Sequence, residues 1–267
     1  MGADIKNLRL RIKSIDSTLN LTNAMGLVAA SKIRRATDAM NKSRSYSKAL
    51  DDSIAMLLSN SECKKNPFVR GHDGNRTKII IIAGDRGLAG GYNANIFRLA
   101  KGFTDAKFLP IGKRACEKYG ASPIAVEGFT FSDCLSLAQS LCREFAENEF
   151  DRLCVISTAY RSVLTQEAIL TEILPLSGIT EQKPAGIIFE PDEQTVLSEL
   201  IPEYVAGKIY ALLKESYACE QASRRNAMDS AGKNAQARLD DLRLSYNRAR
   251  QGAITQEITE IVAGSGQ

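Results

Sequence analysis

The sequence predicts an α/β fold in which long helices at the two ends of the chain form an antiparallel coiled coil, joined to a central Rossmann-like α/β domain. All seven prolines lie between Pro67 and Pro202, so both ends of the chain lack the strongest helix breaker. Between those prolines, strand-like and helix-like segments alternate, as in α/β domains. We therefore expect an N-terminal helix over 1–66, an α/β domain over 67–200 and a C-terminal helix over 201–267.

The N-terminal segment carries apolar or small residues at alternating spacings of three and four, the pattern of a coiled-coil seam. These positions are Ile5, Leu8, Ile12, Ile15, Leu19, Thr22, Gly26, Ala29, Ile33, Ala36 and Met40. The small residues near Gly26 make the seam narrow, so a second helix can approach closely there. One helix over 3–58 would be roughly 84 Å long, which is too long for a globular core of this size to cover. It therefore needs a partner helix.

The partner helix is expected near the C-terminus, where the same spacing recurs. Its seam positions are Leu239, Leu242, Tyr246, Ala249 and Ala253. The apolar positions then shift by one residue, to Ile254, Ile258 and Ile261, so the last turns are expected to pack differently. Upstream the seam would meet Arg225 and Gln221, which predicts weaker pairing or another phase. The alternative to a coiled coil is two ordinary amphipathic helices on a globular core.

The central segment reads as strands alternating with helices. The expected strands are 78–83, 107–111, 123–126, 152–157, 168–174 and 185–189, and the expected helices are 94–102, 113–119 and 132–148. The first strand is a continuous apolar run, which is typical of a strand buried on both faces. This alternation predicts a compact domain of Rossmann-like shape.

A glycine-rich turn, 84–93, follows the first strand at the point where Rossmann-like domains bind phosphate. Its spacing is G-x-x-G-x-x-G-G, which differs from the G-x-G-x-x-G of dinucleotide-binding domains, and it lacks the G-K-[ST] of a P-loop. The favoured interpretation is a shaped turn that packs within the domain or meets a protein partner. Nucleotide binding is the alternative.

The sequence shows no catalytic or metal-binding constellation. The six cysteines include no C-x-x-C pair and His72 is the single histidine, so the common zinc spacings are absent. We expect free thiols in a reducing compartment. A Ser-His-Asp triad would have to use His72, which lies in a loop rich in Gly, Asn and Asp. We therefore expect a chain that is not an enzyme and that holds no cofactor and no metal.

Composition points to an ordinary globular chain, with 25 % charged and 44 % apolar residues. The longest strongly apolar run, 79–83, is far shorter than a membrane-spanning helix. Residues 1–4 lead directly into charged sequence, so we expect neither a secretory signal nor a transit peptide.

Charge is distributed unevenly along the chain. The net charge of +4 is the sum of +7 over 1–50, 0 over 51–76, −4 over 77–200, −1 over 201–223, +4 over 224–250 and −2 over 251–267. Basic helices raise the possibility of nucleic-acid binding, but 1–50 contains a single aromatic residue, Tyr46, and so offers no stacking platform. A basic rod that faces an acidic protein surface and a plainly solvated helical face are the other interpretations. A nucleic-acid-binding coiled coil or another interaction protein remains the alternative function.

Four segments, in order along the chain, resemble the gamma subunit family of F-type ATP synthases. They are Met25–Ala36, Gly84–Asn93, Phe189–Asp192 and Tyr246–Gly264, of which the last resembles the C-terminal signature of the family almost residue for residue. The sequence departs from the family pattern at Gly26, where a larger residue is usual, and at Ala89, where many members have Cys.

The resemblance implies a central stalk that rotates inside the alternating alpha/beta hexamer and couples proton or sodium flow to ATP synthesis or hydrolysis. The active sites would lie on the beta subunits. The implied partners are the alpha and beta subunits, the epsilon subunit and the membrane c-ring, and no nucleic acid. The implied location is peripheral, at the cytoplasmic face of a bacterial plasma membrane. The alternative is the matrix side of the mitochondrial inner membrane.

The resemblance also implies roles for individual residues. Coupling contacts with the beta subunits are implied at Met25, Arg34, Arg35, Arg250, Gln251 and Thr255. Asp85, Arg86 and Gly87 belong to the central loop of the family, which would also approach beta. At each of these positions, plain coiled-coil surface or seam is the alternative.

Overall fold

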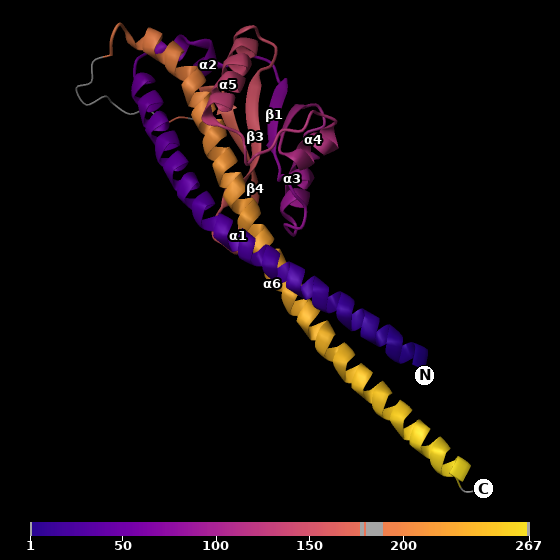
Figure 1. The fold of residues 1–267 in the computed structure, drawn as a ribbon. Helices are drawn as coiled ribbons and strands as arrows, with labels where there is room; N and C mark the ends of the chain where they lie inside the picture. The colour runs from indigo at the N-terminus through magenta and orange to yellow at the C-terminus, as the bar shows by residue number, and fades with distance from the viewer. Residues whose placement is uncertain (1, 177–178, 180–188, 266–267) are drawn as a thin grey trace. The chain divides into compact units, whose positions relative to one another are not determined.

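The computed structural model describes residues 2–176, 179 and 189–265 (Figure 1). The chain forms two compact units. Unit 1 consists of 1–30 and 224–267, and unit 2 consists of 31–223.

Two long helices dominate the chain, as the sequence predicted. Helix α1 (Gly2–Leu57) has 56 residues and helix α6 (Glu193–Ser265) has 73, and each contributes residues to both units. The start of α6 is set by Asp192, whose carboxylate accepts hydrogen bonds from the Thr195 amide at 2.9 Å and the Thr195 hydroxyl at 2.8 Å.

The start of α6 differs from the expected boundary near 201. Pro202 lies inside the helix, although proline was expected to mark the helix limit. A capped first turn and the burial of Leu197 and Ile201 in the core of unit 2 outweigh the hydrogen bond that proline removes. The division of the chain at 66 and 201 into three domains stays a prediction.

Unit 2 is built on a four-stranded sheet in the order β2-β1-β3-β4. The strands are β1 (Thr77–Ile82), β2 (Lys107–Ile111), β3 (Arg152–Tyr160) and β4 (Gln166–Leu174). Strand β1 pairs in parallel with both β2 and β3, whereas β4 runs antiparallel to β3. The parallel part confirms the Rossmann-like prediction, and the antiparallel β4 departs from it.

Helices cover both faces of this sheet (Figure 1). Alternate side chains of β1 point to opposite faces. Ile79 and Ile81 pack with α3 (Tyr92–Ala100) and with Ala115 of α4 (Lys113–Tyr119). Ile80 and Ile82 share a second core with α5 (Phe131–Ala146) and with residues of α1 and α6. Burial on both sides explains why β1 is apolar throughout.

Several sequence-based details were wrong or incomplete. The expected strand at 123–126 is irregular backbone, held by a hydrogen bond from the Gly112 amide to the Ile124 carbonyl at 3.0 Å. Two short helices, η1 (Cys63–Lys65) and α2 (Pro67–Arg70), were not expected. The expected strand at 185–189 lies outside the described residues except for Phe189, which is not in a strand.

The six cysteines are buried and carry free thiols. Burial raises the pKa of Cys134 and of Cys142 to about 12, which keeps both thiols protonated near neutral pH. Within the part of the chain that the structure describes, no helix combines the length and hydropathy needed to cross a bilayer.

Candidate functional site

The paired helices of unit 1 form the coiled coil that the sequence predicted. A Cβ on Gly26 would lie 3.7 Å from Cβ of Met228, and a Cβ on Gly232 would lie 3.2 Å from Oδ1 of Asn23. Residue 228 of α6 thus contacts residue 26 of α1, and residue 232 contacts residue 23. The residue numbers rise along one helix as they fall along the other, so the two helices are antiparallel (Figure 1).

Burial along α1 follows the predicted seam. Every predicted position from Ile5 to Met40 is buried or half-buried, and Thr22, Ala29, Ile33, Ala36 and Met40 are the most enclosed. On α6 the predicted positions from Leu239 to Ala253 are likewise buried or half-buried. Upstream the seam passes through Met228 and Gly232, and the exposed Arg225 lies outside it. Periodicity alone therefore located the contact line of both helices.

The seam on α6 ends at Ala253. The three isoleucines that follow the predicted phase shift, Ile254, Ile258 and Ile261, are 45 %, 56 % and 69 % exposed. The antiparallel register explains this, because α1 reaches its first residue at about the level of residue 250 of α6. The last turns of α6 thus present an apolar surface with no helix of unit 1 beside it.

A groove crosses the coiled coil near Gly26, with a cavity of about 400 Å³. Its lining residues are Thr22, Asn23, Gly26, Leu27, Ala30, Arg225, Met228 and Asp229. Leu27 is 74 % exposed at its rim, and the neighbouring Met25 is half-exposed. The groove exists because the small side chains that narrow the seam leave space beside it.

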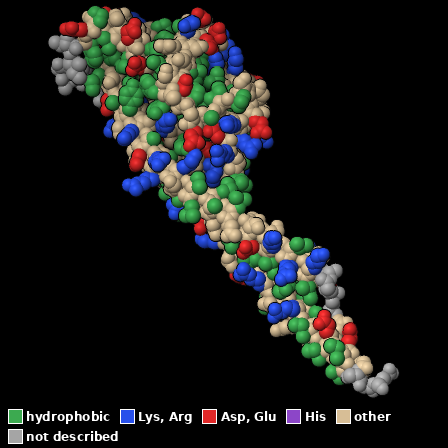
Figure 2. All heavy atoms as spheres, viewed as in Figure 1, with side chains coloured by type: hydrophobic (Ala, Val, Ile, Leu, Met, Phe, Trp, Pro, Cys, Tyr) green, Lys and Arg blue, Asp and Glu red, His purple; other side chains and the backbone are tan. Residues whose placement is uncertain are grey.

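The coiled coil carries the excess positive charge of the chain. Unit 1 contains eleven Lys and Arg and seven Asp and Glu, a net charge of +4, so the remaining 24 basic and 24 acidic residues of unit 2 balance. Figure 2 shows Lys and Arg side chains interspersed with apolar ones along these helices. A basic surface with exposed apolar side chains suits an acidic protein partner.

The residues predicted as coupling contacts do not form one cluster. Met25 lies in unit 1, more than 30 Å along the coiled coil from Gln251, by the rise of about 1.5 Å per residue. Arg250, Gln251 and Thr255 are exposed on α6, and the Thr255 hydroxyl donates a hydrogen bond to the Gln251 carbonyl at 2.9 Å. Arg34 and Arg35 are exposed on the unit 2 portion of α1.

The glycine turn, 84–93, is held by hydrogen bonds within unit 2. The Asp85 carboxylate accepts from the backbone amides of Lys113 at 3.2 Å, Val126 at 2.9 Å and Glu127 at 3.1 Å. Its oxygens therefore tie the turn to α4 and to the segment before α5. Arg86 is exposed, whereas Gly87 faces the Arg114 side chain. Of the three predicted loop residues, Asp85 has a structural role inside the domain.

Sequence reasoning missed Glu127, which connects three parts of unit 2. Its Oε1 accepts hydrogen bonds from Lys32 Nζ at 2.7 Å and from the Tyr217 hydroxyl at 2.9 Å. The hydrogen bond from Lys32 lowers the pKa of Glu127, and Tyr217 and Arg86 act in the same direction. No local pattern marks this residue, because its partners lie 95 and 90 positions away in the sequence.

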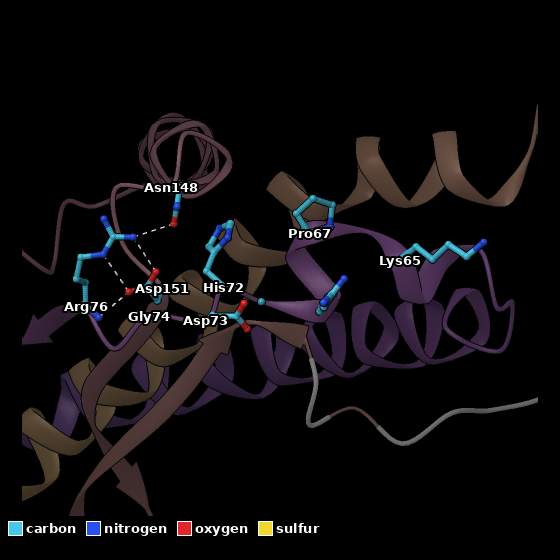
Figure 3. A pocket seen from close by; sticks show the side chains of 10 residues that line it. Lys65, Pro67, His72, Asp73, Gly74, Arg76, Asn148 and Asp151 are labelled. Carbon is cyan, nitrogen blue, oxygen red and sulfur yellow. Dashed lines mark hydrogen bonds and ion pairs between the residues drawn. The ribbon is translucent and has the colours of Figure 1, made fainter.

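The single histidine lies in an open cavity of about 570 Å³ between α2 and the start of β1 (Figure 3). Its ring packs on Phe145, and Nε2 lies 2.9 Å from the Phe145 carbonyl oxygen. The lining residues include no serine, threonine or cysteine, so the geometry offers His72 no nucleophile. Among the described residues, no group of three His, Cys, Asp or Glu side chains is arranged to hold a metal.

An ion pair closes one side of this cavity (Figure 3). The buried Asp151 accepts from Arg76 through Nε at 3.0 Å, Nη2 at 2.8 Å and the backbone amide at 2.7 Å. Arg76 also donates to Oδ1 of Asn148 at 2.8 Å. Arg76 and Asp151 bind one another, so this side of the cavity has a structural role.

This ion pair predicts a pH dependence of stability. Hydrogen bonds from the Arg76 side chain lower the pKa of Asp151 to about 2. A carboxyl whose pKa is lowered by folding stabilises the native state above its unfolded pKa of about 4, and this stabilisation is lost as the pH falls towards 2. We expect Asp151→Asn to lower the urea midpoint near neutral pH, and the gap from wild type to shrink between about pH 4 and 2. A difference in urea midpoint that stays constant between about pH 4 and 2 would contradict this. The control is Asp73→Asn, which replaces an exposed carboxyl in the same cavity.

Comparisons with known proteins agree on one family. The ATP synthase family model matches residues 4–266. The ATP synthase gamma chain of Ruminococcus albus is 37 % identical over 281 residues, covering 98 % of both chains. The sodium ion specific gamma chain of Acetobacterium woodii is 32 % identical and covers 99 % of both. A chain in the rotor of Euglena gracilis mitochondrial ATP synthase shares the fold, with a TM-score of 0.67 at 15 % identity, covering 95 % of this chain and all of the other.

Proposed function

Because the chain belongs to the family of ATP synthase gamma chains, we propose that it is the central stalk of a rotary ATP synthase. In this proposal the coiled coil of unit 1 turns inside a hexamer of alpha and beta subunits. Unit 2 contacts the epsilon subunit and the membrane c-ring. Rotation driven by proton or sodium flow is carried to the beta subunits, where ATP is made or hydrolysed.

The observation that carries this proposal is the construction of unit 1. Two antiparallel helices with a narrow seam make a slender rod. A rod that transmits torque has to resist twisting about its own axis, and close packing of its two helices provides that resistance. The rod carries a net positive charge together with exposed apolar side chains, and the free end of α6 exposes Ile254, Ile258, Ile261 and Val262. These properties suit a shaft surrounded by protein.

We place the coupling contacts on exposed side chains of the two long helices. Arg34, Arg35, Arg250, Gln251 and Thr255 are exposed and Met25 is half-exposed, so each side chain is accessible to a partner. Lys32, a neighbour of Arg34 and Arg35, is instead engaged with Glu127 inside unit 2. Of the glycine turn, we assign Arg86 to the partner surface, because Asp85 is used within the domain.

The proposal assigns no catalytic step to this chain. Its part in the reaction is mechanical, with the active sites on the beta subunits and the chain peripheral to the membrane. The site geometry supports this, because neither the glycine turn nor the His72 cavity assembles a nucleophile with a base.

Reconstitution tests the proposed function. The chain is co-expressed with alpha and beta subunits of its own source, and the complex is purified through a tag on beta. We expect stoichiometric co-purification and faster steady-state ATP hydrolysis than by alpha and beta alone. A chain that fails to associate would overturn the proposal. Binding of the free chain to DNA, weakening steeply with salt, would instead favour a nucleic-acid-binding coiled coil.

A single substitution on the shaft is expected to weaken coupling without preventing assembly. One exposed polar contact is worth ~0–1 kcal/mol, so Gln251→Ala should lower the ratio of ATP-driven ion pumping to ATP hydrolysis by at most about fivefold. Gln236→Ala, an exposed glutamine on the same helix that pairs with Asp240, is the matched control and should leave the ratio unchanged. Loss of the chain from the complex on Gln251→Ala would show that this residue is needed for assembly, against this division of roles.

A further inference from the structure

Strand β1 lies between β2 and β3, so the chain leaves it towards one neighbour and later returns to the other. In open α/β sheets, ligands bind at this switch point, outside the carboxyl ends of the strands. Here that position is filled by helix α6. A Cβ on Gly84, the second residue after β1, would lie 2.9 Å from Cδ and 3.0 Å from Oε1 of Glu220. Glu220 is only 1 % exposed.

Hydrogen bonds join α6 to both sides of the switch point. The Tyr92 hydroxyl, at the start of α3, donates to the Ser216 carbonyl at 3.0 Å. The Thr158 amide of β3 donates to Oγ of Ser216 at 3.2 Å. The Ser223 hydroxyl donates to the Ala89 carbonyl in the glycine turn at 2.8 Å. Two turns of one helix are thus bonded to the turn after β1 and to the end of β3.

The contact between α6 and the sheet is buried and formed by polar groups that are hydrogen-bonded to one another. Ser216 and Cys219 are fully buried, and Cys219 Sγ lies 3.4 Å from the Thr158 carbonyl oxygen, to which it donates. Burial, and then the charge of Glu220, raise the pKa of Tyr92 well above its usual value, so its hydroxyl stays protonated and remains a donor. The Tyr160 amide of β3 donates to Oε1 of Glu215, the residue before Ser216, at 2.7 Å.

We propose that the switch point of this sheet is a socket for the chain's own helix α6, in which the Glu220 carboxyl occupies the place where nucleotide-binding α/β domains hold a phosphate. Gly84 admits the carboxyl because any side chain there would meet it. The socket fixes the unit 2 part of α6 to the sheet. The inference deepens the proposed function, because it names the joint through which torque passes between α6 and the α/β domain.

The socket also explains why the glycine turn departs from phosphate-binding patterns. A phosphate in this position would have to displace a buried carboxyl group. In addition, Asp85 already accepts from the Lys113 amide at the start of α4. Gly84 therefore serves the close approach of a helix.

A double-mutant cycle on the full chain tests the socket. We expect Gly84→Ala to speed amide hydrogen exchange of 213–223 by at least about tenfold, because its methyl group displaces Glu220. Glu220→Ala removes the atoms that the methyl group of Gly84→Ala would meet. The amides of 213–223 in the double variant should therefore exchange more slowly than the sum of the two single-variant effects predicts. Additive effects would overturn the proposal. Gly128→Ala is the control, since a Cβ there meets nothing within 4 Å.

A milder pair keeps the test valid if Gly84→Ala does not fold. Ser223→Ala removes one hydrogen bond between α6 and the turn and should speed exchange of 213–223 about threefold. Ser245→Ala removes a hydrogen bond within α6 and should leave 213–223 unchanged. Equal exchange in wild type and Ser223→Ala would contradict a socket.

Two further readouts separate the socket from the proposed function. Calorimetry of the wild-type chain with Mg-ATP should show no binding, and stoichiometric binding that Gly84→Ala abolishes would overturn the socket. In the assembled complex, Ser223→Ala should lower the ratio of ion pumping to hydrolysis, with Ser245→Ala as control. Faster exchange with an unchanged ratio would support the socket and contradict its role in torque.

Discussion

Replacing Gly112 by alanine is expected to lower the free energy of unfolding by about 4 kcal/mol or more. Gly112 has φ of +99°, and a Cβ there would lie 1.9 Å from the carbonyl oxygen of Ala83. The Ala83 carbonyl oxygen is a backbone atom, so it cannot move aside by a change of side-chain rotamer. The carbonyl belongs to the residue that follows β1, and the amide of the same residue donates to Ile111, the last residue of β2, at 2.9 Å. Relief of the clash would therefore break the junction of the two strands.

Urea denaturation followed by circular dichroism measures this effect. Gly128→Ala is the matched control, because Gly128 lies in the same unit in open space, and its effect should stay within about 0.5 kcal/mol. A loss below about 1 kcal/mol for Gly112→Ala would show that the β1 and β2 ends are less tightly joined than the distances indicate.

Replacing Gly207 by leucine is expected to cost about 3 kcal/mol or more. Gly207 lies on α6 in unit 2, where a Cβ would be 2.3 Å from Cδ1 of Leu50 and 3.1 Å from Cε1 of Tyr46. The seam of α1 is narrow here as well, with Ser43 and Ser47 buried on the same line. A leucine would force the helices apart and open the core that Leu50 shares with Ile54.

A double variant that combines Leu50→Ala with Gly207→Leu tests whether the loss of stability is caused by the steric clash between these two positions. The alanine at 50 leaves space that the new leucine can fill, so the double variant should be more stable than Gly207→Leu alone. Thermal denaturation of the four chains gives the coupling between the two sites. If the swap were no more stable than the single variant, the contact between 207 and 50 would not be the cause of the loss.

The parts of the fold that repeat along the chain were predictable. A seam spaced by three and four residues identifies the buried side of α1 from Ile5 to Met40, because helical periodicity is fixed by backbone geometry. The same reasoning located the end of the seam on α6 at Ala253. Continuous apolar runs located β1 and β3 for a similar reason, since burial on both faces removes polar positions.

The parts that depend on distant pairs were not predictable. In the sequence Glu127 and Glu220 look like ordinary charged residues. Their structural roles depend on contacts with residues far away along the chain. Proline was taken as a helix limit, yet Pro202 lies in a helix whose burial compensates for the lost hydrogen bond. The sequence also showed no sign of the hydrogen bonds that Asp85 accepts within unit 2, and the approach of its loop to a partner stays a prediction.

The most direct test of the central claim is to observe whether the chain turns. Ala121 is exposed in unit 2, and the six native thiols are buried, so a probe on Ala121→Cys labels one position. With the complex fixed through its beta subunits, we expect unidirectional rotation of the probe that requires ATP and stops when ATP is exhausted. A probe that stays still while the same complexes hydrolyse ATP would contradict a rotating shaft.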